Sequence, residues 1–256
     1  MLEIEHVSRS FGGVKALAKL DLSLDTGVVL GLIGPNGSGK TTLFNVLSGV
    51  YPADSGTILL RGKNITNSKP QEIIRFGIAR TFQNLRLYKR MTVFDNVWIA
   101  QHSLPDVALR ELILASRKKE KSRRQQVQHL LEVTGLIDHS EQLAGGLPLP
   151  QQRRLELARA LVRSPDLLLL DEPAGGMTPT ETEEMGELIR ETAAPGRTCI
   201  IIEHKMDLLS GLCQRLCVLN FGEKIAEGAP REVFEHPDVL EAYLGRSRPN
   251  ACGARP

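Results

Sequence analysis

The chain has 256 residues, which is room for one large domain or two small ones at ~150 residues per domain. Its 41% hydrophobic and 24% charged residues are typical of a folded globular protein and exclude a disordered or collagen-like chain. The 32 basic and 30 acidic residues leave a formal charge of +2, so the overall charge indicates no nucleic-acid partner.

Neither a membrane span nor an export leader is predicted. The longest stretch without a charged residue, 26–39, falls short of the ~18 apolar residues that a spanning helix needs. No charged and then apolar leader opens the sequence, which is the pattern that directs a chain to export. We therefore expect a soluble protein inside the cell.

The opening segment predicts two kinds of strand and then a helix. Leu20, Leu22 and Leu24 alternate with polar or charged residues, as half-buried antiparallel strands do. Residues 28–33 form a continuous apolar run, which is the pattern of a strand covered on both faces. A helix is expected over residues 43–47.

A glycine-rich loop connects that buried strand to that helix. Residues 34–42 match the phosphate-loop pattern, in the strand–loop–helix context that it requires. Glycines let successive backbone N–H groups converge on phosphate oxygens, and the helix N-terminus adds a positive dipole. Lys40 would supply a cation to the β- and γ-phosphates, and the Thr41 hydroxyl would ligate Mg²⁺. We predict a nucleoside triphosphate site formed by Gly34, Asn36, Gly37, Ser38, Gly39, Lys40, Thr41 and Thr42.

The rest of the chain divides into a helical middle and a second set of buried strands. Residues 88–161 contain no strand-like run, whereas residues 167–170 and 199–202 are again continuously apolar. Between these two runs, Thr178-Pro-Thr-Glu181 predicts a helix that starts with a capping box. Buried strands that alternate with helices favour an α/β core around a mainly parallel sheet.

The predicted organisation is therefore an α/β core with an insertion. The core is of the P-loop NTPase type, with a mainly parallel sheet and an antiparallel β subdomain, over residues 1–87 and 162–245. A helical subdomain is inserted at residues 88–161, and residues 246–256 form a flexible tail.

Two strand ends carry the residues expected to act on the nucleotide. Asp171 and Glu172 directly follow the leucine run at 167–170, where open α/β sheets place their ligands. Asp171 would bind Mg²⁺, and Glu172 would polarise the attacking water. His204, after the strand at 199–202, would hydrogen-bond a γ-phosphate oxygen; this prediction depends on the combination of His204 with the phosphate loop and the acidic pair, because a lone histidine at a strand end is usually incidental.

In order and spacing, these motifs resemble those of ATP-binding cassette (ABC) ATPases. The shared features are the phosphate loop, Gln83 in the Arg-Thr-Phe-Gln segment, Asp171-Glu172-Pro and His204, and the resemblance covers residues 1–245. It implies that Phe11 stacks on adenine, and that Gln83 contacts Mg²⁺ and links the site to the helical subdomain. It also implies that two cassettes pair head to tail around two ATP molecules.

Within that family, the chain most resembles the ATP-binding subunit of branched-chain amino-acid importers. This rests on Phe-Gly-Gly at 11–13, on residues 77–83, 151–156 and 172–177, and on the ending Glu-Ala-Tyr-Leu-Gly at 241–245. The implied partners are permease subunits, a second cassette and, indirectly, a solute-binding protein, at the cytoplasmic face of the inner membrane. The lipopolysaccharide-export ATPase shares the Tyr-Leu-Gly ending, so that transporter or another amino-acid or amide importer is the alternative.

The segment that matches the family's signature motif departs from it. Where relatives usually carry Leu-Ser-Gly-Gly-Gln, this chain has Leu147 followed by Pro148, Leu149, Pro150 and Gln151 (the signature segment, residues 147–151). Compared with the usual motif, a hydroxyl and two backbone N–H donors are missing. A simpler interpretation is that Pro150 occupies the first position of a helix over residues 151–162, where proline is tolerated.

Because a signature faces the partner's nucleotide, the missing donors would weaken one of two sites. We predict an asymmetric heterodimer in which this chain's own phosphate loop, Asp171, Glu172 and His204 act with an intact signature from the partner.

Other functions have less support in the sequence. A weakly hydrolysing regulatory cassette is suggested by the signature segment alone, whereas a GTPase lacks support because no Asn-Lys-x-Asp motif occurs. The basic segment at residues 117–124 is either a solvated helix face or a contact for anionic lipid. Lys205 stands where relatives often have an acidic residue.

Overall fold

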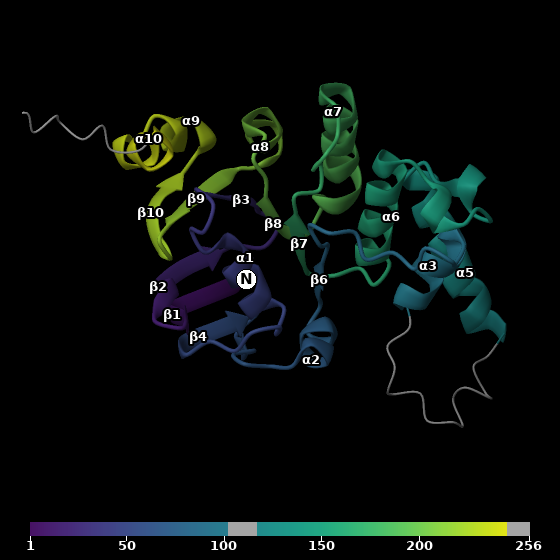
Figure 1. The fold of residues 1–256 in the computed structure, drawn as a ribbon. Coiled ribbons are helices and arrows are strands. Elements are labelled where there is room, and N and C mark those ends of the chain that lie inside the picture. Colours follow the sequence, from purple (N-terminus) through teal and green to yellow (C-terminus); the bar gives the residue numbers. More distant parts are fainter. Residues whose placement is uncertain (102–116, 245–256) are drawn as a thin grey trace, which may run out of the picture.

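A small antiparallel sheet is built from the first strands of the chain (Figure 1). The computed structural model describes residues 1–101 and 117–244. Its four-stranded sheet has the order β2-β1-β4-β5, with antiparallel neighbours. The strands are β1 (Leu2–Phe11), β2 (Val14–Leu24), β4 (Ser55–Leu60) and β5 (Lys63–Asn64). Leu20, Leu22 and Leu24 are all buried, which confirms the prediction from their alternation.

A second, six-stranded sheet carries the strand ends that matter for the site. Its order is β10-β9-β3-β8-β7-β6, parallel except for β10 at one edge. The strands are β3 (Val29–Ile33), β6 (Ile78–Arg80), β7 (Leu167–Asp171), β8 (Thr198–Ile202), β9 (Arg215–Asn220) and β10 (Glu223–Gly228).

The continuous apolar runs are explained by two hydrophobic clusters, one on each face of this sheet. Leu30 and Leu32 of β3 belong to one cluster, whereas Val29 and Ile33 belong to the other. The first cluster includes the antiparallel sheet and α1 (Lys40–Leu47). The second is covered by α7 (Pro179–Leu188) with the π-helical turn Ile189–Ala193, α8 (Met206–Leu212), α9 (Pro230–Phe234) and α10 (Pro237–Leu244).

The middle of the chain is helical and has a buried cluster of its own. Here lie α3 (Val93–Gln101), α5 (Arg117–Val133) and α6 (Leu149–Leu161), with 3₁₀ turns Ile137–His139 and Ala144–Gly146, while α2 (Pro70–Arg75) lies nearer the core. Val93, Val97, Val127 and Leu131 pack together in the third cluster. Residues 157, 160 and 161 of α6 pack instead on the main sheet's cluster, so α6 joins the two parts. This arrangement supports our proposed division at residues 88–161; the proposed tail lies outside the described residues.

The first residues of α7 and α6 test two predictions made from the sequence. Thr178 and Glu181 form the predicted capping box of α7. The predicted start of α6 is wrong: the helix begins at Leu149, with Pro148 as N-cap and Pro150 inside the first turn. A proline is accommodated there because the first-turn N–H groups have no partner inside the helix. In the described residues, no helix combines the length and apolar character needed to cross a bilayer.

The basic segment lies at the start of α5. From Glu120 onward its side chains are exposed, and Arg124 pairs with Glu120 while its guanidinium lies 5.3 Å from the Trp98 ring centre. The exposure of these side chains is compatible with both predicted roles, a solvated helix face and a contact for anionic lipid.

Candidate nucleotide-binding and hydrolysis site

Most of the predicted site residues meet at one edge of the main sheet. Strands β3, β8, β7 and β6 are neighbours in that sheet, and the loops after their carboxyl ends carry the phosphate loop, His204, Glu172 and Gln83. These loops enclose a cleft of about 260 Å³ that is lined by Asn36, Gly37, Ser38, Gly39, Lys40, Thr41, Thr42, Gln83, Glu172, Ile202 and His204. Ligands of open α/β sheets bind at this edge.

The phosphate loop has a backbone that only glycine fits at two positions. Gly34 has φ 146°, and a Cβ there would lie 2.1 Å from the Leu219 carbonyl oxygen. Gly39, the N-cap of α1, has φ 111°, and a Cβ there would lie 2.4 Å from the Ala16 carbonyl oxygen. The loop therefore packs against the neighbouring backbone, and its residues 36–39 line the cleft at the start of α1.

Lys40 is held at the centre of this loop. Its ammonium donates to the carbonyl oxygens of Gly34 (2.7 Å) and Pro35 (2.9 Å). Burial lowers the pKa of Lys40, and the carboxylates of Glu172 and Asp171 oppose that change. The side chain is thus a buried cation, which favours a polyanionic ligand.

Glu172 is the point on which three loops converge. Its Oε1 accepts a hydrogen bond from Gln83 Nε2 (3.0 Å) and lies 3.2 Å from His204 Nε2. Glu172 itself has φ 49°, an uncommon conformation for a residue other than glycine. The arrangement directs a carboxylate, oriented by two neighbours, into the phosphate cleft.

Asp171 is buried behind the cleft. Its Oδ2 accepts a hydrogen bond from Arg80 (2.9 Å), and its backbone N–H donates to the Thr81 hydroxyl (3.0 Å). Burial raises the pKa of the Asp171 carboxyl, and Arg80 opposes the rise. With the hydroxyl of Thr41 and the amide oxygen of Gln83, the predicted metal ligands are all oxygen donors, which Mg²⁺ prefers.

The residues on either side of His204 brace the loop that follows Glu172. The buried Glu203 carboxylate accepts N–H bonds from Ala174 and His204, both at 2.9 Å. The Lys205 ammonium donates to the carbonyl oxygens of Ala174 and Met177, both at 3.0 Å, and to Thr182. Lys205 therefore links the end of β8 to the loop that follows Glu172.

Phe11 lies outside the cleft lining, at the end of β1. Its ring packs edge-on against Tyr51, with centroids 5.1 Å apart, and the Arg9 guanidinium lies 4.6 Å from its centre. Phe11 and Tyr51 remain partly exposed. Tyr51 was not predicted because it is distant from Phe11 in the sequence, whereas Arg9, two residues before Phe11 on the same strand, could have been found from the alternation of side chains along β1.

The signature segment is not part of this cleft. Pro148, Leu149, Pro150 and Gln151 form the first turn of α6, and none of them lines the cleft made by the same chain's phosphate loop. The segment is thus free of its own chain's nucleotide site, as the predicted head-to-tail pairing requires.

Two buried charges on α6 connect the signature segment to Gln83. Glu156 accepts the Phe82 N–H (3.1 Å), and Arg153 donates to the Phe82 carbonyl (3.3 Å). Arg153 also reaches the Gly175 carbonyl (3.5 Å) in the loop after Glu172. These two residues were missed by the prediction, although they share a helical face with the apolar Leu157 and Ala160, which is a recognisable sign of burial.

Replacing Glu156 with Ala is expected to lower the free energy of unfolding by about 3–5 kcal/mol, because it leaves the buried Arg153 guanidinium without its carboxylate. Glu184→Ala is the matched control. Glu184, whose side chain is 55% exposed, forms an ion pair with Arg154, and exposed ion pairs contribute at most about 1 kcal/mol. Urea unfolding of the two variants checks this. Equal losses of unfolding free energy in the two variants would show that the buried Arg153–Glu156 pair contributes no more to stability than the exposed Arg154–Glu184 pair.

Comparisons with known proteins identify the family of the chain. The family model for ABC transporters matches residues 17–175. This chain belongs to the ABC transporter family. A model for the branched-chain amino acid ATP-binding cassette transporter matches residues 223–248 of the cassette.

Relatives of the cassette match it over nearly its whole length. The high-affinity branched-chain amino acid transport ATP-binding protein LivG of Escherichia coli (strain K12) is 40% identical, over 96% of the cassette and 98% of LivG. The corresponding BraF protein of Pseudomonas aeruginosa is 39% identical over the same shares. A crystal structure of the ADP conformation of an ABC transporter cassette superposes with a TM-score of 0.84 at 35% identity, covering 96% of this chain and 99% of that one.

Proposed function

We propose that this cassette binds and hydrolyses ATP to energise an ABC importer of branched-chain amino acids. The observation that carries the proposal is the Glu172 carboxylate, oriented by Gln83 and His204 at a phosphate-loop cleft. The similarity to LivG and BraF supports the solute class.

The roles proposed for the site follow from these positions. Glu172 takes a proton from the attacking water, His204 donates to the γ-phosphate, and Lys40 with the loop amides holds the β- and γ-phosphates. Thr41, Gln83 and Asp171 would hold Mg²⁺, which neutralises developing phosphate charge. Phe11, with Tyr51 beside it, stacks on adenine.

The proposed partners are a second cassette, whose signature completes this chain's site, and permease subunits at the cytoplasmic face of the inner membrane. A solute-binding protein on the other side of the membrane would deliver the amino acid.

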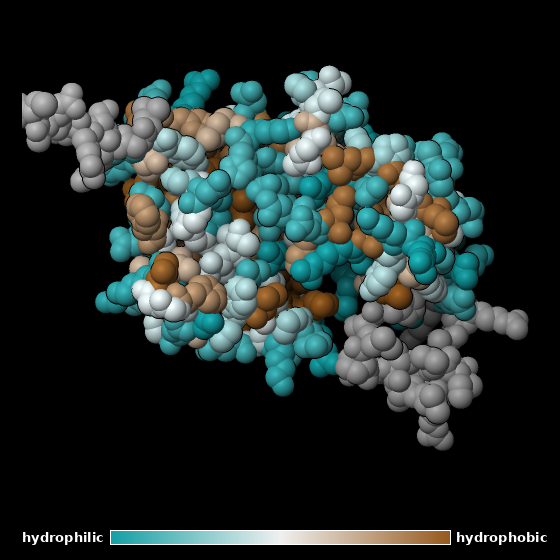
Figure 2. All heavy atoms as spheres, viewed as in Figure 1, coloured by the Kyte–Doolittle hydropathy of each residue, from teal (hydrophilic) through white to brown (hydrophobic). Residues whose placement is uncertain are grey.

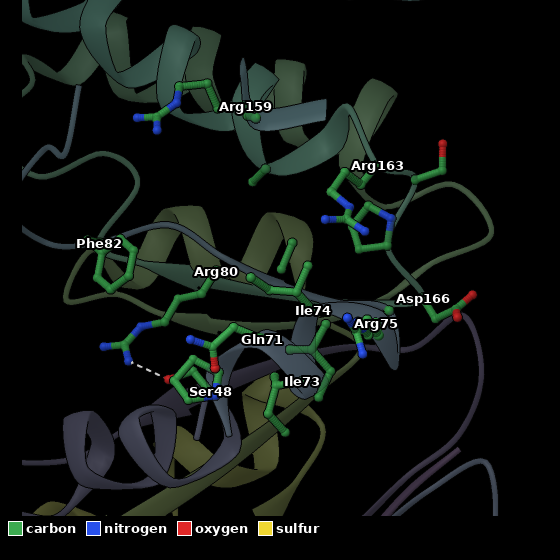
Figure 3. A pocket seen from close by; sticks show the side chains of 18 of the residues that line it. Ser48, Gln71, Ile73, Ile74, Arg75, Arg80, Phe82, Arg159, Arg163 and Asp166 are labelled. Atoms are coloured by element: carbon green, nitrogen blue, oxygen red, sulfur yellow. Dashed lines mark hydrogen bonds between the residues drawn. The ribbon is translucent and has the colours of Figure 1, made fainter. Parts of the chain in front are cut away.

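A groove between the core and the helical part is the proposed seat of a permease segment. Its volume is about 880 Å³, and Figure 2 shows a hollow on this side of the molecule with hydrophobic side chains beside it. In Figure 3, Arg159 and Arg163 form one wall, Ile73 and Ile74 of α2 the other, and Arg80 lies between them. Five arginines line the groove against two acids, so an acidic segment fits it. The arginines are Arg75, Arg80, Arg86, Arg159 and Arg163.

Reversing two of these charges, with Arg75→Glu and Arg163→Glu together, is expected to abolish co-purification with the permease subunits while ATP affinity of the chain alone is kept. Like charges at an interface cost several kcal/mol. Arg231→Glu, on α9 outside the groove, is the control. Unchanged co-purification of the double variant would show that the groove does not seat the permease.

Uptake of labelled leucine into proteoliposomes, with the permease subunits, both cassettes and the solute-binding protein, tests the proposed function. ATP-dependent uptake that unlabelled isoleucine or valine suppresses, and alanine does not, is the expected result. ATP hydrolysis without such uptake would assign the cassette to another solute.

A further inference from the structure

Arg80 joins the three elements that carry the predicted metal ligands. It ends β6, and its side chain is 7% exposed. One arm of the guanidinium donates to Asp171 on β7 (2.9 Å). The other donates to Asn45 (2.7 Å) on α1 and to Ser48 (3.0 Å), the C-cap of that helix.

Two aromatic rings and a carboxylate stabilise the buried guanidinium of Arg80. Its guanidinium lies 5.4 Å from the Phe44 ring centre and 5.1 Å from that of Phe82. Burial lowers the pKa of Arg80, and the Asp171 carboxylate opposes this. A buried guanidinium is retained where its planar fork satisfies two partners at once.

Arg80 therefore holds Asp171, the proposed metal ligand, through one of its two carboxylate oxygens. Within the described ranges, only Oδ2 of Asp171 receives a hydrogen bond, and Arg80 donates it, so Oδ1 remains for a metal or its water. Thr41 belongs to α1, which Arg80 ties through Asn45, and Gln83 follows Arg80 by three residues.

We propose that Arg80 is a positioning residue that fixes Asp171, and the spacing of Asp171 from α1, for Mg²⁺. This rests on the proposed function, because Asp171 is assigned to the metal there. Arg80 also lines the groove, so a segment seated in the groove contacts the residue that holds the metal carboxylate.

Calorimetry of ATP binding with and without Mg²⁺, in the Glu172→Gln background, tests the inference without any hydrolysis. Arg80→Met is expected to reduce the Mg²⁺-dependent gain in ATP affinity by about 10–100-fold, the usual effect of removing a residue that orients a metal ligand. ATP affinity without Mg²⁺ should stay near that of the parent, and Arg231→Met should leave both quantities unchanged.

Two further variants separate the possible failures. In an Asp171→Asn background, Arg80→Met should cause no additional loss if Arg80 acts through Asp171. Arg80→Lys retains the charge, but a lysine can bond either Asp171 or the α1 residues and not both. Its loss of the Mg²⁺-dependent gain in ATP affinity should therefore be intermediate. This variant replaces Arg80→Met if Arg80→Met does not fold. A full Mg²⁺ gain in both Arg80 variants, with the gain lost in Asp171→Asn, would overturn the inference alone. A full gain in Asp171→Asn itself would overturn the proposed metal role of Asp171.

Discussion

Glu172→Gln is expected to lower ATP turnover by about 100- to 10,000-fold while ATP still binds, because the amide cannot accept a proton from the attacking water. Oε1 of Glu172 already accepts a bond from Gln83, so the other carboxylate oxygen, Oε2, is the one that we propose takes the proton. Glutamine keeps the shape of the side chain, so the backbone of the phosphate loop is not expected to move.

Phosphate release by the assembled transporter, measured alongside nucleotide occupancy, checks this expectation. Glu183→Gln, the same change at an exposed position of α7, is the matched control and should retain wild-type turnover. Turnover of the Glu172 variant within a few-fold of wild type would exclude this residue as the base.

Restoring donors in the signature segment, with Pro148→Ser and Pro150→Gly, is expected to raise total turnover of the transporter by up to about twofold, because hydrogen bonds regained on a γ-phosphate add a second working site to the one that this chain's own loop already forms. The two prolines supply no N–H at the start of α6. Each charge-assisted hydrogen bond regained on a γ-phosphate contributes about 1.5–3 kcal/mol.

The control for the signature variant is Pro237→Ser at the start of α10, which removes a proline from another helix start. Phosphate release should not respond to that change. Turnover that also fails to respond to the signature substitutions would end the idea that the prolines impair one of the two sites.

Much of the fold was predictable because local patterns determine it. The leucine run at 167–170 and the run at 199–202 became buried strands, since their alternate residues supply the two clusters on the sheet's faces. The α7 capping box depends only on Thr178 and Glu181, three residues apart. The exact start of α6 was missed because Pro148 and Pro150 both suit a first turn.

The residues of the site were predicted from the sequence, but the buried hydrogen bonds that hold them in place were not. Arg80 and Asp171 are 91 residues apart, and Phe82 and Glu156 are 74 apart. Such pairs depend on strand order and on the seating of α6, which no local pattern encodes. Lys205 likewise acquires its role only because β8 lies beside β7.

Light scattering of the purified Glu172→Gln chain with ATP and Mg²⁺, alone and with the partner cassette of its transporter, tests the proposed asymmetric pairing most directly. Removal of the base should trap any ATP sandwich that forms. We predict that the chain alone binds ATP and stays monomeric, and that an ATP-dependent dimer forms when the partner supplies an intact signature. An ATP-dependent homodimer of this chain alone would contradict the account, because it would show that the proline-containing signature grips nucleotide.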